Sequence, residues 1–213
     1  MPLPPFTESG DLPQGVHRVA FDDVGARFGS GTLQRRWVFL RLERLYSLAR
    51  GSGHLARVIV FGSFVTTKSE PNDVDVFLLM ADSFDVSVTT GETRLLFDHL
   101  AADAHFGASV FWLRRLAAWE GEQAAVEYWQ VKRNGQRRGV VEIDLGGIMI
   151  ALDQELHATL DRIRHFQEQI AHLRIAETNP ANFRLSVSGF LADIDRMQLE
   201  VREYSASTPW TRQ

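Results

Sequence analysis

The sequence contains no cysteine, which excludes disulfide bonds, thiolate nucleophiles and cysteine-ligated zinc. It also lacks any apolar run approaching the roughly 18 residues needed to cross a bilayer. The opening segment, Met-Pro-Leu-Pro-Pro-Phe, has neither the basic nor the apolar region of a signal peptide. We therefore expect a cytoplasmic protein with no membrane segment.

An excess of basic residues is missing as well, because 23 lysines and arginines stand against 27 acidic residues. Proteins that coat nucleic acids neutralise phosphates with lysine and arginine, so a net charge of -4 argues against such a role. The remaining composition, 45% hydrophobic and 23% charged, is that of a globular chain. Its 213 residues suffice for one domain with a substantial appendage, or for two small domains.

The first 150 residues contain two kinds of pattern. Residues 1–30 are rich in proline and glycine and are expected to form an irregular arm, whereas residues 31–150 are expected to form an α+β domain. In that domain, helical spacing of apolar residues and short β-branched runs predict these elements in chain order: helix 33–50, strands 57–61 and 74–80, helix 91–104 and strand 109–113. Asn134-Gly135 is typical of a type I′ turn and predicts a hairpin between residues 127–133 and 139–145. Residues 117–129 would also suit a helix, which leaves the first hairpin arm open.

Residues 151–205 are predicted to form a C-terminal αα-hairpin. Apolar residues recur there at steps of 3 and 4, and from Phe183 to Tyr204 they follow a heptad pattern. The two helices either pack on each other and on the first domain, or residues 153–205 provide the surface for a homodimer or a protein partner. Residues 206–213 have no period and are expected to be frayed.

The chemistry is concentrated in Gly62-Ser63, which follow one predicted strand, and in Asp73-Val74-Asp75, which begin the next. Glycine allows a tight turn and close approach to a ligand, and free N–H groups after it suit a phosphate. Asp73 and Asp75 are two residues apart, so their side chains point to the same face of the strand. Adjacent carboxylates repel unless a cation balances them, and Mg²⁺ prefers oxygen ligands shared with phosphates.

The spacing of these segments, Phe61-Gly62-Ser63, nine residues, then Asp73-Val74-Asp75-Val76, resembles the signature of the nucleotidyltransferase superfamily, the DNA polymerase β-like fold. The resemblance covers about residues 12–150. Within the superfamily the chain is similar to a small bacterial branch that opens with Leu-Pro-x-Gly-x-His, here residues 12–17. That branch also carries Gly-Ser-Phe-Val-Thr-x-Lys, here residues 62–68, and a later Gly-x-x-x-Gly stretch, here beginning at Gly135. The fold implied is a mixed sheet flanked by helices.

The resemblance also implies roles for individual residues. Gly62 and Ser63 would hold the triphosphate of an NTP, and Lys68 in the following loop would contact phosphate. Asp73 and Asp75 would bind Mg²⁺ or Mn²⁺, and paired metals stabilise both the attacking and the leaving oxygen of an in-line displacement. The acceptor would be a hydroxyl on a protein, an RNA or a small molecule, and minimal members of the superfamily often belong to toxin–antitoxin or defence systems.

One position departs from the superfamily pattern. A third carboxylate is expected on a neighbouring strand, but the segment Phe106-Gly107-Ala108-Ser109-Val110-Phe111 carries Ser109 where an aspartate is expected. Either Glu142 or Asp144 supplies the missing ligand as a further catalytic residue, or catalysis is lost. For Glu142 and Asp144 themselves, a solvated strand face is the simpler explanation. If catalysis is lost, the chain is a degenerate nucleotide-binding or interaction module that acts through its C-terminal helices.

Other polar residues are expected to be structural. His17 is expected to make a structural hydrogen bond in the arm. Four basic residues around Asn134-Gly135 are expected to lie on a solvated hairpin tip rather than on a phosphate: Lys132, Arg133, Arg137 and Arg138.

Overall fold

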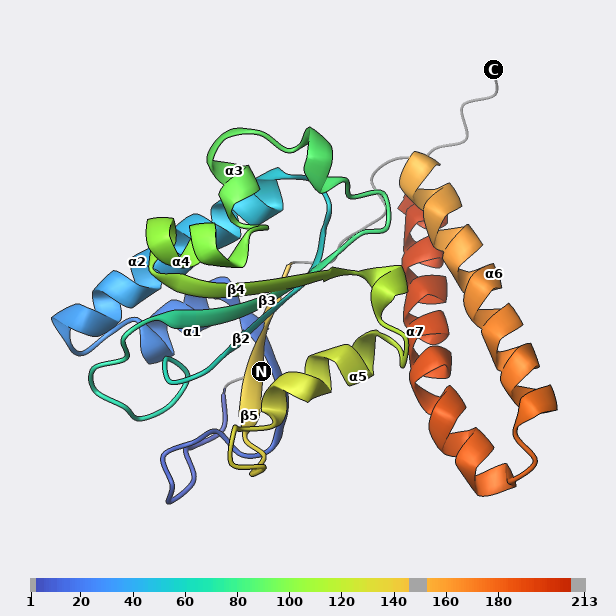
Figure 1. The fold of residues 1–213 in the computed structure, drawn as a ribbon, viewed down its shortest axis with the longest axis horizontal. Coiled ribbons are helices and arrows are strands. Elements are labelled where there is room, and N and C mark those ends of the chain that lie inside the picture. Colours follow the sequence, from blue (N-terminus) through green and yellow to red (C-terminus); the bar gives the residue numbers. More distant parts are fainter. Residues whose placement is uncertain (1–2, 146–152, 208–213) are drawn as a thin grey trace. The chain divides into compact units, whose positions relative to one another are not determined.

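The structure, a computed structural model, describes residues 3–145 and 153–207. The chain forms two compact units, Met1–Ala117 with Val126–Gly146, and Ala118–Ala125 with Gly147–Gln213. In chain order, with η for 3-10 helices, the elements are β1 (Gly15–Ala20), α1 (Phe21–Phe28), α2 (Leu33–Gly51), β2 (Leu55–Phe61), β3 (Val74–Met80), η1 (Val86–Val88), α3 (Gly91–Leu95), α4 (His99–Phe106), β4 (Ala108–Arg114), η2 (Arg115–Ala117), α5 (Glu122–Glu127), η3 (Tyr128–Gln130), β5 (Gly139–Asp144), α6 (Asp153–Ala176) and α7 (Pro180–Ser207) (Figure 1).

The first unit is built on a five-stranded mixed sheet in the order β1-β5-β2-β3-β4. The outer pairs, β1 with β5 and β3 with β4, are parallel, whereas β2 is antiparallel to both of its neighbours. This topology places the end of β2 beside the start of β3, at the same end of the sheet, with Phe61 opposite Asp75. The sequence therefore correctly predicts an α+β domain with a mixed sheet flanked by helices.

One face of the sheet carries the main core. Alternate residues of the strands, such as Val60, Val76 and Val110, pack with apolar side chains of α1, α2 and α4 in one buried cluster. Helix α2 contributes Val38, Leu42, Leu45 and Ala49 at helical spacing. Its Thr32 N-cap accepts a hydrogen bond from the backbone N–H of Arg35, so both the start and the buried side of α2 are fixed.

Three sequence-based expectations for this unit are wrong. Residues 1–30 are not an irregular arm throughout, because β1 and α1 form there, and β1 pairs with the distant β5. The predicted helix 91–104 is broken, since Asp98 caps a new helix, α4, by accepting from the N–H of Ala101. The predicted hairpin between residues 127–133 and 139–145 is reduced to the isolated bridge Val131–Arg137, whereas the helical alternative for residues 117–129 is found, as α5 followed by η3.

The Asn134-Gly135 turn is also of another type. Only Gly135 has a positive φ, of 80°, and no residue other than glycine has one in the described part of the chain. Gly135 donates to the carbonyl of Lys132, and the Asn134 side chain accepts from the N–H of Gln136. Two central residues in the right-handed region followed by a left-handed glycine make a type I turn with a bulge, not a type I′ turn.

The second unit contains α6 and α7, which share an apolar cluster of Ile163, Phe166, Phe190, Ile194 and Met197. The rings of Phe166 and Phe190 meet edge to face at 5.2 Å. Positions of the α7 heptad series are therefore buried inside the chain, which favours internal packing over a dimer surface. No helix among the described residues is both long and apolar enough to span a bilayer. The expected frayed tail falls mainly on residues 208–213, outside the described residues.

Candidate functional site

The candidate site lies where β2 ends and β3 begins. Asp73 directly precedes β3, and Asp75 is its second residue, paired with Phe61 at the end of β2. On the other side, Asp75 pairs with Ser109 of the parallel strand β4. Asp73, Asp75 and Ser109 are all half-buried, and the Ser109 hydroxyl lies 3.4 Å from Oδ2 of Asp73. The two carboxylates and the serine therefore form one polar cluster.

Gly62 is required at this point for two reasons. Its φ of 80° lies in the left-handed region that glycine adopts without strain. A Cβ at Gly62 would also collide with the carboxylate of Asp75, so the Asp75 side chain occupies space that only glycine leaves free. The turn after β2 and the Asp75 carboxylate are thus in direct contact.

Asp75 is the electrostatically perturbed group of the site. Burial raises the pKa of its carboxyl from 3.8 to about 6, and the charge of the neighbouring Asp73 adds to the rise. Arg138, Arg133 and Ser109 oppose the rise and lower the pKa. Two carboxylates that repel each other at a partly buried strand end are the arrangement that a bound cation relieves.

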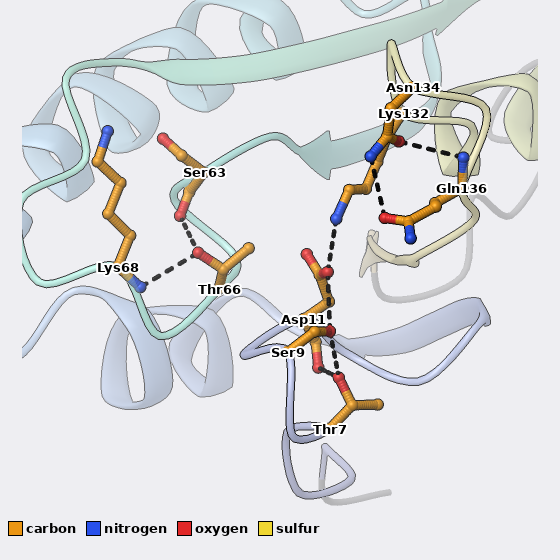
Figure 2. Close-up of polar contacts among 9 residues, drawn as sticks. All are labelled: Thr7, Ser9, Asp11, Ser63, Thr66, Lys68, Lys132, Asn134 and Gln136. Atoms are coloured by element: carbon orange, nitrogen blue, oxygen red, sulfur yellow. Dashed lines mark hydrogen bonds and ion pairs between the residues drawn. The ribbon is translucent and has the colours of Figure 1, made fainter.

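The turn that follows Gly62 has free backbone donors. The N–H of Thr66 donates to the carbonyl of Ser63, which closes the turn, and the Thr66 hydroxyl donates to the same carbonyl at 2.7 Å (Figure 2). Within the described chain, the N–H groups of Ser63, Phe64 and Val65 donate to no protein acceptor. Successive free N–H groups in such a turn form an anion-binding concavity. It is a turn and not the opening of a helix.

Lys68 lies at the exposed end of this loop. Its backbone N–H is held by the Thr66 hydroxyl at 3.2 Å, and its ammonium extends in the same direction as the Ser63 hydroxyl in Figure 2. Nothing in the described residues brings the Lys68 side chain into contact with Asp73 or Asp75.

Side chains of helix α2 and its N-cap bind the main chain of the loop between Gly62 and Asp73. The buried Arg35 donates to four carbonyls, those of Phe28, Phe64, Thr66 and Lys68. Burial lowers the pKa of Arg35. The hydrogen bonds of its guanidinium end on these carbonyl oxygens and not on a carboxylate. Three further donors on or next to α2 bind later loop carbonyls: Thr32 to Ser69, Gln34 to Pro71 and Arg41 to Asn72.

Arg41 also joins the loop to the start of β4. Its Nη1 lies 3.2 Å from the carbonyls of both Asn72 and Gly107. Gly107 has a φ of 61° and leaves room for the Arg41 guanidinium, because a Cβ there would lie 2.9 Å from Nη1. Asn72 precedes Asp73, and Gly107 precedes β4 by one residue, so Arg41 sets the separation between Asp73 and Ser109.

The N-terminal segment before β1 is packed beside the site. The N–H of Thr67 donates to the carbonyl of Gly10, and Asp11 forms an ion pair of 2.8 Å with Lys132 (Figure 2). Leu12 is buried, and the His17 ring bonds the carbonyl of Pro13 at 2.7 Å, the structural role expected for this histidine. The segment thus connects the loop after β2 to the loop before β5.

The structure does not bring Glu142 or Asp144 to the carboxylate cluster. Glu142 is buried and paired with Arg57 through two hydrogen bonds of 2.8 Å. Asp144 pairs with Arg18 at 3.2 Å, and it lies three residues beyond Val141, which is opposite Val60. Gly62 lies two residues beyond Val60 in the opposite direction, so five residues separate Asp144 from the Gly62 turn along the sheet, roughly 17 Å at about 3.3 Å per residue. The described residues contain no group of three or more acidic or histidine side chains placed to hold a metal ion.

Four aromatic side chains lie on the same face of the sheet, directly next to the cluster. Trp129 of η3 stacks on Phe61 with ring centres 4.5 Å apart, and it lies 4.7 Å from Phe111 and 5.4 Å from Phe77. Phe77 and Phe111 follow Asp75 and Ser109 by two residues and therefore share their face. Trp129 and Phe111 remain partly exposed, so two mutually tilted apolar rings lie beside the carboxylates.

Comparison with known proteins places this unit in a family. Residues 4–144 match the profile of a family of unknown function, DUF6932. The chain belongs to DUF6932. The DUF6932 match includes every residue of the candidate site and ends at the last residue of β5, so it leaves α6 and α7 outside. Neither a curated protein nor a solved structure matches the chain.

Two features of the site were not anticipated from the sequence. Arg35 resembles any arginine of an amphipathic helix, and its acceptors are carbonyls up to 33 residues away. Arg138 was assigned to a solvated hairpin tip, whereas its charge acts on Asp75. Its position directly before the apolar strand β5 is the only sequence signal for a role at the edge of the sheet.

Proposed function

We propose that this chain is a nucleotidyltransferase-like protein that binds an NTP together with Mg²⁺ or Mn²⁺ at the Gly62 turn. The observation that supports this most directly is the contact between Gly62 and Asp75, because it joins free backbone donors and a carboxylate pair in one place. Phosphates and a divalent cation are ligands that such a place accepts together. The proposal includes the DNA polymerase β-like fold that the resemblance implies for the first unit, followed by a C-terminal αα-hairpin.

The carboxylates fit a divalent ion shared with phosphate oxygens. Asp73 and Asp75 are two hard oxygen ligands that repel each other, and burial together with the charge of Asp73 raises the pKa of Asp75 to about 6. The ion would neutralise phosphate charge and polarise the phosphorus centre. The third position is a serine, so the ligand set is smaller than the superfamily pattern requires for a two-metal centre.

The chain's own residues supply binding and orientation. The N–H groups after Gly62 and the Ser63 hydroxyl would bind phosphate oxygens, and Trp129 with Phe111 offers a surface for a base. In the transfer, an acceptor hydroxyl oxygen forms a bond to the α-phosphorus, the bond to the bridging oxygen breaks, and pyrophosphate leaves. The proton of the hydroxyl passes to solvent or to a carboxylate of the pair. The acceptor is a hydroxyl of a protein, an RNA or a small molecule, in a toxin–antitoxin or defence context.

The second candidate is a degenerate nucleotide-binding or interaction module. It is favoured by Ser109, which stands beside Asp75 where a third carboxylate would complete the site. In this case the chain binds nucleotide without transferring it, and the helical unit holds a partner.

The test is ligand-induced stabilisation measured by thermal shift with each of the four NTPs and Mg²⁺ or Mn²⁺. A ligand at 100 times its Kd stabilises by about 2.7 kcal/mol, which raises the Tm of a chain of this size by roughly 5–10 °C. We expect this rise in the wild type and in Asp144→Asn, and its loss in the double variant Asp73→Asn/Asp75→Asn. An equal rise in the double variant would refute the proposed site. Incubation with α-³²P-labelled NTP and cell extract then separates the candidates, because only a transferase leaves label on an acceptor.

A further inference from the structure

Arg138 is a cation without a partner among residues 3–145 and 153–207, and it lies at the same end of the sheet as the candidate site. It directly precedes β5, and β5 is antiparallel to β2 with Val141 opposite Val60. Continued towards the strand ends, that register brings the start of β5 beside the end of β2 and the Gly62 turn.

No described residue accepts a hydrogen bond from the guanidinium of Arg138. Its Nε is buried and makes no hydrogen bond, and no carboxylate of the described residues lies within ion-pair distance of it. Two buried arginines of this unit, Arg35 and Arg57, have acceptors in the structure. A charged group with a buried, unpaired N–H is costly, and an anion bound to the rest of the partly exposed Arg138 guanidinium offsets that cost.

The backbone around Arg138 is fixed on both sides. The N–H of Arg138 donates to the carbonyl of Gln130, and the N–H of Gly139 donates to the carbonyl of Leu12. A Cβ at Gly139 would collide with the carbonyl of Pro13, so the strand start is packed tightly against the N-terminal segment. The position of the Arg138 main chain is therefore set before any ligand binds. Arg133, in the turn before it, adds a second positive charge that acts on Asp75.

We propose that Arg138 binds an oxygen of a polyphosphate chain whose other oxygens lie on the N–H groups of the Gly62 turn. The inference rests on the proposed function and adds a residue that selects triphosphates over monophosphates. A triphosphate offers the oxygens of separate phosphate groups to the Gly62 turn and to Arg138, whereas a monophosphate offers only those of one. Arginine suits this role because its planar N–H groups match phosphate geometry.

The experiment is calorimetric titration of the full chain with ATP, GTP, CTP, UTP, AMP and inorganic tripolyphosphate, each with Mg²⁺. The variants are Arg138→Ala and Arg138→Lys, and the matched control is Arg137→Ala, which removes the neighbouring exposed arginine. One charge-assisted hydrogen bond corresponds to a loss of affinity of about 10- to 100-fold. We expect Arg138→Ala to lose that much for tripolyphosphate and the bound NTP, Arg138→Lys to lose less, and Arg137→Ala to change affinity less than about threefold.

The outcomes separate the two proposals. If Arg138→Ala binds NTP as tightly as Arg137→Ala does, the role of Arg138 is refuted while nucleotide binding stands. If the wild type binds no NTP but binds tripolyphosphate through Arg138, the proposed function is refuted and the anion site stands. If Arg138→Ala lowers the affinity for AMP as much as it lowers the affinity for tripolyphosphate, Arg138 does not select by phosphate length, and the inference fails. Because Arg138 has no hydrogen-bond partner to lose, we expect all variants to keep the Tm of the wild type within about 3 °C.

Discussion

Replacing Asp75 with asparagine should make the metal-free protein more stable at neutral pH. In the folded chain the pKa of Asp75 is raised from 3.8 to about 6 by burial and by Asp73. Between these two values the folded state binds more protons than the unfolded state, so stability falls as the pH rises through this range. A pKa rise of this size lowers the free energy of unfolding by about 3 kcal/mol at most, since each pKa unit corresponds to about 1.4 kcal/mol. Asparagine has nearly the same shape and carries no charge, so Asp75→Asn removes this cost.

The measurement is urea unfolding in the presence of EDTA at pH 4, 6 and 8, for wild type, Asp75→Asn and the control Asp144→Asn. We expect Asp75→Asn to exceed the wild type by about 2–3 kcal/mol at pH 8 and by close to nothing at pH 4. Asp144 is exposed and paired with Arg18, so its replacement should change stability by less than about 1 kcal/mol. An Asp75→Asn protein less stable than wild type at pH 8, or a difference independent of pH, would refute the electrostatic argument.

Two further predictions concern the loop after β2. Gly62→Ala should lose more stability than Gly135→Ala, because both glycines have a φ of 80° but only Gly62 is in contact with a side chain. The backbone strain common to both variants is about 1–2 kcal/mol. Urea unfolding measures the loss of stability in each, and equal losses would show that the collision at Gly62 is unimportant. Arg35→Met should cost at least about 3 kcal/mol, since it leaves four carbonyls without their donor. Amide exchange should rise between residues 64 and 68, and unchanged exchange there would contradict the role assigned to Arg35.

The central strands could be predicted because they are short and almost continuously apolar. Strands β2 and β3 have neighbours on both sides and bury nearly every residue, so their sequences differ clearly from the surrounding turns. Strand β1 could not be predicted in the same way. It is an edge strand with one buried residue, Val19, and its partner β5 lies more than 100 residues further along the chain.

The candidate site shows the same division between local and distant information. Gly62, Ser63, Asp73 and Asp75 follow from spacing, since a turn and the next strand are local features of the sequence. Asp144 shares a strand face with Glu142, but the sequence does not show how far along the sheet that strand is shifted. The part played by Arg138 depends on the pairing of β5 with β2, which no local pattern reveals.

The hold of α2 on the loop after β2 has a consequence for how the site can diverge. Every bond that α2 and its cap make to residues 64–72 ends on a main-chain oxygen, so the helix recognises the path of the loop and is indifferent to its side chains. Thr67, Lys68, Ser69 and Glu70 are exposed, and they can be exchanged without disturbing that path. The path of the loop and the identity of its exposed side chains are thus separate properties of the molecule, so these side chains can change at little risk to folding.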